Sequence, residues 1–204
     1  MLKLKLEGKC YKVKTIEINK GVTVLTGPNG SGKSYACRQI KDYLLENNKP
    51  YIDIDVYTEG KTIADSFVSQ GDMKSVAKYF NASEGQRVFD TLVDVNVPKV
   101  GDFVRRLLKD KQKEGFIIMD GCDSGVSIDL LMSIREFISM VLEDCENARI
   151  DIHIILTANN YELIPHYDCI WIPTMEHYSR GDEADGYNLW RYRYEEVYKA
   201  RNKK

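Results

Sequence analysis

The sequence predicts an α/β fold with a mostly parallel sheet flanked by helices, and three observations support that prediction. Short apolar, β-branched runs predict buried strands at residues 22–26, 116–120, 150–156 and 169–172, and residues 51–56 read as a further strand. Helical stretches separate these runs, and the strongest amphipathic helix is expected over 130–144. A glycine-rich loop joins the first run to a helix expected over 35–46. Such alternation is typical of a parallel sheet, because each helix carries the chain back to the end where the next strand begins.

Two further segments extend this plan to a single domain over residues 1–204. Residues 2–6 and, more loosely, 13–18 alternate apolar and polar side chains, which predicts strands with one wet face that add an antiparallel N-terminal edge to the sheet. Residues 62–115 are polar and helical in character, and we expect them to form a short helical subdomain. No sustained heptad occurs there, which argues against a long coiled coil.

Near the C-terminus, residues 187–194 interleave aromatic and polar side chains. The alternation predicts a strand that pairs with the one around Trp171. Interleaved arginines and aromatics also suit a platform for single-stranded nucleic acid, and that alternative stays open.

Composition and charge narrow the classes of function. Lysine and arginine number 29 against 31 acids, for a net charge of −2, which argues against the large basic surface of a non-specific DNA-binding protein. A local DNA contact stays open. The five cysteines form no C-x-x-C pair, which argues against a zinc site or a disulfide framework. Neither a signal peptide nor an apolar run long enough for a bilayer occurs, so we expect a cytoplasmic protein without membrane contact.

Residues 27–34 carry the strongest motif, because they satisfy G-x-x-x-x-G-K-[ST] between a predicted buried strand and a predicted helix. Glycines let backbone N–H groups converge on phosphate oxygens, and the helix N-terminus adds a positive dipole end. We expect ATP with Mg²⁺ here, with Lys33 at the β and γ phosphates and Ser34 as a metal ligand. The predicted nucleotide contacts are Gly27, Pro28, Asn29, Gly30, Ser31, Gly32, Lys33, Ser34 and Tyr35.

Three further segments follow this loop along the chain. Residues 82–87 read A-S-E-G-Q-R, and Ser83 can cap a helix whose first N–H groups would face an anion. The same residues also fit an ordinary capping box. Asp120 ends a predicted buried strand, where its carboxylate is placed for the water shell of Mg²⁺. Residues 157–160, T-A-N-N, follow the next buried strand.

Together these segments resemble the ATP-binding cassette (ABC) ATPases, above all the branch that contains RecF, the SMC proteins and the double-strand-break repair ATPases. The resemblance covers residues 2–172 and implies a P-loop NTPase fold of the ABC type. It makes 82–87 the cassette signature, which contacts the γ-phosphate held by a second subunit. The signature contacts implied in this way are Ser83, Gly85 and Gln86.

The same resemblance implies further contacts. Residues 127–129 match the D-loop that crosses the dimer interface, and residues 157–160 stand where the family has its switch segment. Gln70 occupies the place of the Q-loop glutamine by its order alone, and a plain surface glutamine is the alternative. Tyr11 is a candidate for stacking on the adenine. The implied metal contacts are Ser34, Gln70 and Asp120.

Two positions depart from the family pattern, and both concern catalysis. Gly121 stands where active members carry a glutamate after the Walker B aspartate, and Ala158 stands where they carry the switch histidine. General-base help is worth about 10²–10⁴-fold in rate, so we expect slow hydrolysis unless another group substitutes. Asp123 is the nearest substitute, and Asn159 or Asn160 could position a water. The candidate catalytic residues are therefore Lys33, Asp120 and Asp123.

These features predict an ATPase that dimerises head to tail on ATP and acts as a switch in DNA metabolism or phage–host processes. The alternative is a regulatory module with essentially no turnover that binds nucleotide and docks a protein partner. A transporter ATPase subunit fits less well, because the helical region is short. A small-molecule kinase also fits less well, because segments 82–87 and 127–129 would have no explanation.

Overall fold

The computed structural model describes most of the chain. The described residues are 1–8, 11–55, 69, 72–91, 95–121, 123, 126–160, 163–164, 167–178, 191, 195–196 and 199. Gln70, predicted to contact metal and nucleotide, lies outside them. The backbone of Tyr11 lies in a strand, but its side chain is outside the description, so stacking on an adenine stays a prediction.

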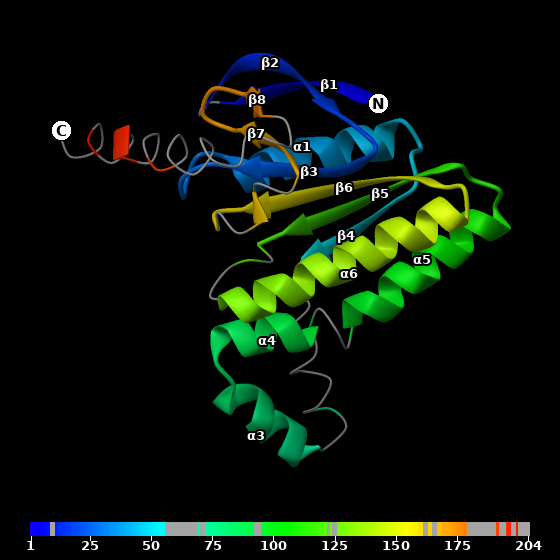
Figure 1. The fold of residues 1–204 in the computed structure, drawn as a ribbon, viewed down its shortest axis with the longest axis vertical. Helices are drawn as coiled ribbons and strands as arrows, with labels where there is room; N and C mark the ends of the chain where they lie inside the picture. Colours follow the sequence, from blue (N-terminus) through cyan, green and yellow to red (C-terminus); the bar gives the residue numbers. More distant parts are fainter. Residues whose placement is uncertain are drawn as a thin grey trace.

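The centre of the fold is a six-stranded sheet that is parallel except at one edge (Figure 1). Its strands occur in the order β4-β5-β6-β3-β7-β8, and only the pair β7–β8 is antiparallel. Their bounds are β3 Gly21–Thr26, β4 Tyr51–Asp55, β5 Glu114–Asp120, β6 Asp151–Ala158, β7 Asp168–Trp171 and β8 Glu176–Tyr178. The predicted mostly parallel α/β fold is therefore confirmed.

Helices cover both faces of this sheet, because the apolar strands bury side chains on either side. In β5, Ile117 and Met119 face α5 and α6, whereas Phe116 and Ile118 face α1. Figure 1 shows α5 and α6 side by side on one face and α1 on the other. The bounds are α1 Lys33–Glu46, α5 Val97–Lys109 and α6 Ile128–Asn147.

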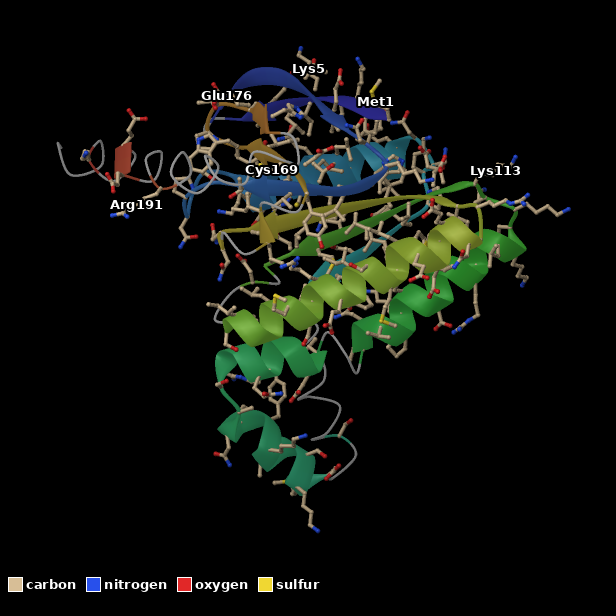
Figure 2. All side chains as sticks on the ribbon, viewed as in Figure 1. Met1, Lys5, Lys113, Cys169, Glu176 and Arg191 are labelled. Atoms are coloured by element: carbon tan, nitrogen blue, oxygen red, sulfur yellow. The ribbon has the colours of Figure 1, made fainter. Side chains whose placement is uncertain are left out.

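The N-terminal strands β1 (Leu2–Gly8) and β2 (Tyr11–Ile18) pair antiparallel, with Leu2 opposite Ile18. The predicted antiparallel N-terminal strand pair is therefore confirmed, but it forms a two-stranded sheet of its own and is not an edge of the main sheet. The reason is their apolar face, which packs on α1, so that α1 lies between the two sheets. Lys5 points outward on the wet face (Figure 2).

The middle of the chain is helical where the structure describes it. Helices α3 (Met73–Asn81) and α4 (Glu84–Thr91) project away from the sheet (Figure 1). Asp72 caps α3, because its side chain accepts hydrogen bonds from the backbone N–H and the hydroxyl of Ser75. These helices and α5 confirm the predicted helical character of this region, of which residues 62–68, 70–71 and 92–94 lie outside the described part.

The strand predicted at 187–194 does not take the place beside Trp171. That place belongs to β8, in which Glu176 lies opposite Trp171. A tight turn explains the difference: the Met175 N–H donates to the Trp171 carbonyl at 2.7 Å, so the chain returns to the sheet edge at once. Arg191 is helical, and the other residues of 187–194 lie outside the described chain.

Candidate nucleotide-binding site

The phosphate loop joins β3 to α1 at the carboxyl end of the parallel strands, where α/β sheets bind their ligands. Gly27, Gly30 and Gly32 have φ of 145°, 77° and 100°, a region that favours glycine. A Cβ on Gly27 would also lie only 2.9 Å from Ser31 Oγ and 3.0 Å from Pro173 Cδ. A residue with a Cβ would therefore be strained in these backbone conformations, and glycine is not.

Lys33, the first residue of α1, is buried within this loop. Its ammonium donates to the carbonyl oxygens of Gly27, at 2.7 Å, and Pro28, at 3.2 Å. Burial lowers the pKa of Lys33, and the charges of Asp123 and Asp120 oppose that shift. Among the described residues, no carboxylate forms an ion pair with Lys33, and a buried cation held by backbone carbonyls is well suited to receive a phosphate.

Asp120, at the end of β5, meets side chains from two other elements. Its Oδ1 accepts from the hydroxyl of Thr157, at 2.6 Å, and from that of Ser34, at 3.3 Å. The Thr157 hydroxyl in turn accepts from the Gly121 N–H at 2.9 Å. These contacts follow from the strand order, which places β6 between β5 and β3. Hydroxyl and carboxylate oxygens are the donors that Mg²⁺ prefers, so Ser34 and Asp120 fit the predicted metal.

Asp123 is buried in the same region, with 7% of its surface exposed. Its Oδ2 accepts from two consecutive backbone N–H groups, those of Asn159 at 2.6 Å and Asn160 at 2.7 Å. Burial raises the pKa of Asp123, and these N–H groups together with the charge of Lys33 oppose the rise. The carboxylate thus ties the chain after β5 to the chain after β6.

The loop and these side chains enclose a cavity of about 380 Å³. That volume lies in the range of about 300–1,000 Å³ that is usual for small-molecule sites. The lining residues are Asn29, Gly30, Gly32, Lys33, Ser34, Tyr35, Asp120, Gly121, Asp123, Thr157 and Asn159. Two side-chain oxygens beside it, Ser31 Oγ and Asn159 Oδ1, are buried without a hydrogen-bond partner in the described structure. The donors present therefore fit a triphosphate with Mg²⁺.

Comparison with known families agrees with this geometry. A family model described as an AAA domain matches residues 16–164, which is more than half of the chain. The chain belongs to the AAA domain family. Membership indicates a nucleotide-binding ATPase domain with a P-loop. No curated protein matches the chain.

Within this AAA domain, the residues predicted to contact nucleotide separate into two groups. Those of the phosphate loop, with Asp120 and Asp123, come together around the cavity. Of the signature residues whose side chains the structure describes, Ser83 and Gln86 lie at the start of α4 and are not among the lining residues of the cavity. Ser83 Oγ accepts from the Gln86 N–H at 3.2 Å, so the predicted cap forms, while the Gln86 amide donates to Asp90 at 2.6 Å. In one chain, then, the signature has a local structural role.

Thr157 is the contact that sequence reasoning undervalued. Its place in the switch segment predicts no contact with Asp120, whereas in the structure its hydroxyl links Asp120 to Gly121. The signal was available in one respect, since a polar residue ended an otherwise apolar strand. The sequence could not indicate that Thr157 bonds to Asp120, because this contact depends on the order of the strands.

In the described structure, no helix of this AAA domain combines the length and the apolar composition needed to cross a bilayer.

Gly121 adopts φ of 74°, in the left-handed region. Replacing it with the glutamate of active cassettes, Gly121→Glu, is expected to lower the free energy of unfolding by about 1–2 kcal/mol, the cost of this conformation for a residue with a Cβ. Relief of the strain would disturb the N–H that holds Thr157. We therefore expect ATP turnover to fall or stay unchanged, measured as phosphate release beside urea unfolding.

Gly121→Ala is the matched control, because it introduces the same backbone strain without a carboxylate. We expect the two variants to unfold alike. A rise in turnover for Gly121→Glu alone, at the stability of the unmodified protein, would show that a glutamate is accommodated at this position.

Proposed function

We propose that this chain is an ATP-dependent molecular switch of the RecF and SMC type that binds Mg²⁺–ATP, dimerises on it and hydrolyses it slowly. The observation that carries the proposal is the approach of Ser34 and Asp120, 86 positions apart, to 3.3 Å in front of a glycine loop that encloses Lys33. A buried cation beside a pair of hard oxygen donors is the combination that a triphosphate with Mg²⁺ requires.

In the proposed complex, the loop N–H groups and the Lys33 ammonium hold the phosphates. Lys33 would exchange its bonds to the carbonyls of Gly27 and Pro28 for bonds to phosphate oxygens. Ser34 and Asp120 would hold the metal ion, which neutralises charge on the β and γ phosphates. Thr157 fixes the Asp120 carboxylate through a 2.6 Å hydrogen bond, so this ligand needs little rearrangement.

Dimerisation is proposed because the signature lies apart from the cavity of its own chain. Ser83 is exposed immediately before α4, so its side chain and the positive end of the helix dipole lie together at this end of the helix. A second copy related by a two-fold axis would bring these groups to the nucleotide. Ser127 and Ile128, in the proposed D-loop, are also exposed, and Ile128 exposes 62% of its surface.

Slow hydrolysis is proposed from two side chains. Gly121 lines the cavity with no side chain, and Ala158 is a buried methyl group where active cassettes carry a histidine. Neither residue can accept a proton or orient a water through its side chain. Losing such help typically lowers rates by about 10²–10⁴-fold. Slow hydrolysis would prolong the ATP-bound state. Such a state suits a switch in DNA metabolism or phage–host processes, and it suits equally a module that docks a protein partner.

The test is the solution mass by light scattering with Mg²⁺–ATP, with Mg²⁺–ADP and without nucleotide, together with phosphate release. We expect a dimer with Mg²⁺–ATP alone and slow phosphate release. Ser83→Arg should keep the protein monomeric while it still binds ATP, because the larger arginine side chain would block the proposed dimer interface sterically. The lost cap costs about 1 kcal/mol, so its unfolding is measured as well.

Gln112→Arg is the control, because it adds the same side chain at an exposed position next to Lys113, which points into solvent at the far end of the molecule (Figure 2). A monomer in every condition, with ATP bound, would reject the dimer and favour the module that docks a partner. Turnover of about 1 s⁻¹ or faster, the rate of ordinary enzymes, would reject the slow switch.

A further inference from the structure

A groove of about 290 Å³ runs between α5 and α6, the two helices that lie side by side on one face of the sheet (Figure 1). We call it the α5–α6 groove. Its floor is apolar, because Val100 and Val141 are buried there and Val104 and Phe137 pack against the core. It shares no lining residue with the phosphate cavity, so its occupant would be separate from the nucleotide.

The rims of the groove expose apolar side chains to solvent. Val97 on α5 exposes 40% of its surface, and Met140 on α6 exposes 64%. Leu108, which helical spacing places on the same face of α5 as Val97, exposes 50%. Exposed apolar side chains grouped beside an apolar floor mark a surface that another molecule can cover.

Gly101 lies inside α5 and lines the groove. A glycine in a helix interior lowers stability relative to alanine, because it loses more conformational freedom on folding. The described structure shows no need for it: a Cβ at this position would meet Arg105 Nη1 at 3.7 Å, which is an ordinary van der Waals contact. The missing side chain instead leaves room for a close approach from outside the chain.

Opposite charges flank the groove. Arg105 stands on the α5 side and Asp144 on the α6 side, and both are exposed. The ion pair that Arg105 forms is with Asp102 on its own helix, and within the described chain Asp144 forms none. Arg106 and Lys109 add exposed positive charge to α5. A ligand that lies along the groove would therefore meet positive charge on one side and negative charge on the other.

We propose that the α5–α6 groove is a docking site for an amphipathic helix of a protein partner. The apolar face of that helix would pack on Val97 and Met140 and lie against Gly101, with acidic side chains along the edge beside α5 and basic ones along the edge beside α6. Two helices side by side form a furrow into which a third helix packs. An extended peptide would find no backbone partners there, because the backbone groups of α5 and α6 bond within their own helices.

A second copy of this chain fits the groove less well. Packing α5 on α5 would bring Arg105, Arg106 and Lys109 of the two copies together, so the charges would select α5 of one copy over α6 of the other. Each helix would then lie above a helix and not above the groove, and the space at Gly101 would stay unfilled. A single helix seated between α5 and α6 fills it.

The probe is a synthetic peptide of about 14 residues, or about 21 Å, held helical by a hydrocarbon link on its outer face. It carries leucines on one face, glutamates along one edge and lysines along the other, with no net charge. We expect saturable binding to the whole, nucleotide-free protein at micromolar concentrations, measured by fluorescence anisotropy. A control peptide of the same composition, with its leucines scattered around the helix, should bind at least about tenfold more weakly, because it buries less apolar area.

Gly101→Ala separates docking from stability. The added methyl group should weaken peptide binding at least about fivefold, because it takes up space that the peptide fills. The same change should raise the midpoint of thermal unfolding by about 2–4 °C, since alanine favours the helix. Weaker binding by a more stable protein cannot result from misfolding. Ser139→Ala, exposed on α6 outside the groove lining, is the control and should bind normally.

Arg105→Glu and Asp144→Arg should each weaken binding about three- to tenfold, because one edge of the peptide then meets like charge in either direction. The double variant should bind within about twofold of the unmodified protein, because a peptide turned end for end exchanges its two edges. Glu143→Arg is the matched control for Asp144→Arg, since it makes the same change at an exposed acid of α6 outside the groove lining. It should bind normally.

Each contrary result has a distinct meaning. No binding by the unmodified protein, or equal binding of the scattered peptide, would overturn the docking site. Full binding by Gly101→Ala would overturn the close approach to α5. Additive losses in the double charge variant would overturn the arrangement of the two charged edges. A nucleotide-free dimer in light scattering that excludes the peptide would assign the groove to a second copy. All of these measurements omit nucleotide, so they leave the proposed ATP switch to its own test.

Discussion

Lys33→Ala is expected to weaken ATP binding by at least about ten- to hundredfold, which corresponds to the 1.5–3 kcal/mol typical of a hydrogen bond to a charged group. Among the described residues, the Lys33 ammonium donates to the Gly27 and Pro28 carbonyls of the loop. Phosphate oxygens would replace those weaker partners. Titration calorimetry with Mg²⁺–ATP measures the loss directly.

The same substitution should cost the free protein little stability. Burial lowers the pKa of Lys33, which means that the folded state holds its charge at a cost. Lys41→Ala is the matched control on α1, since Lys41 pairs with Asp53 at 2.6 Å outside the cavity. We expect it to bind ATP normally. Normal binding by Lys33→Ala would mean that the loop is not the phosphate site.

Asp120→Ala is expected to remove the dependence of ATP binding on Mg²⁺ and to lower hydrolysis by at least about 100-fold, since a metal ion supplies several kcal/mol to such reactions. Asp120 is the carboxylate that Ser34 and Thr157 both contact. Binding isotherms recorded with Mg²⁺ and with a chelator should differ for the unmodified protein and coincide for the variant.

Asp120→Asn separates charge from structure. Its amide oxygen can still accept from the Thr157 and Ser34 hydroxyls, so the local fold is expected to persist, but the negative charge that attracts the metal is gone. We expect its isotherms to coincide as well, with unfolding close to that of the unmodified protein. A Mg²⁺ dependence preserved in Asp120→Asn would move the metal to other ligands.

The sequence was sufficient for the parts of the fold that depend on local patterns. The sequence runs located both ends of β3 to β7 within two residues, mainly because a strand buried on both faces has few polar positions to obscure it. The phosphate loop was equally clear, because its glycine spacing is set by the backbone. α1 begins at Lys33, two residues before the expected start, since the loop glycines lead directly into the helix.

The parts that depend on long-range packing were harder to predict. Nothing in residues 1–18 distinguishes an edge of the main sheet from a separate pair packed on α1, because both need one apolar face. The bond from Thr157 to Asp120 required the knowledge that β6 lies between β5 and β3. The two hydrogen bonds that Asp123 accepts come from backbone N–H groups, which every residue except proline carries, so no sequence pattern could mark them.

The position of α1 between two sheets has an energetic consequence for the ligand. The helix that starts at Lys33 is fixed on one side by β1 and β2 and on the other by the main sheet. The phosphate loop and the start of α1 are therefore already ordered in the folded chain. Binding a triphosphate does not have to pay the conformational entropy of ordering them. This preorganisation predicts that affinity resides mainly in the phosphates, so that ADP and inorganic triphosphate should compete measurably with ATP.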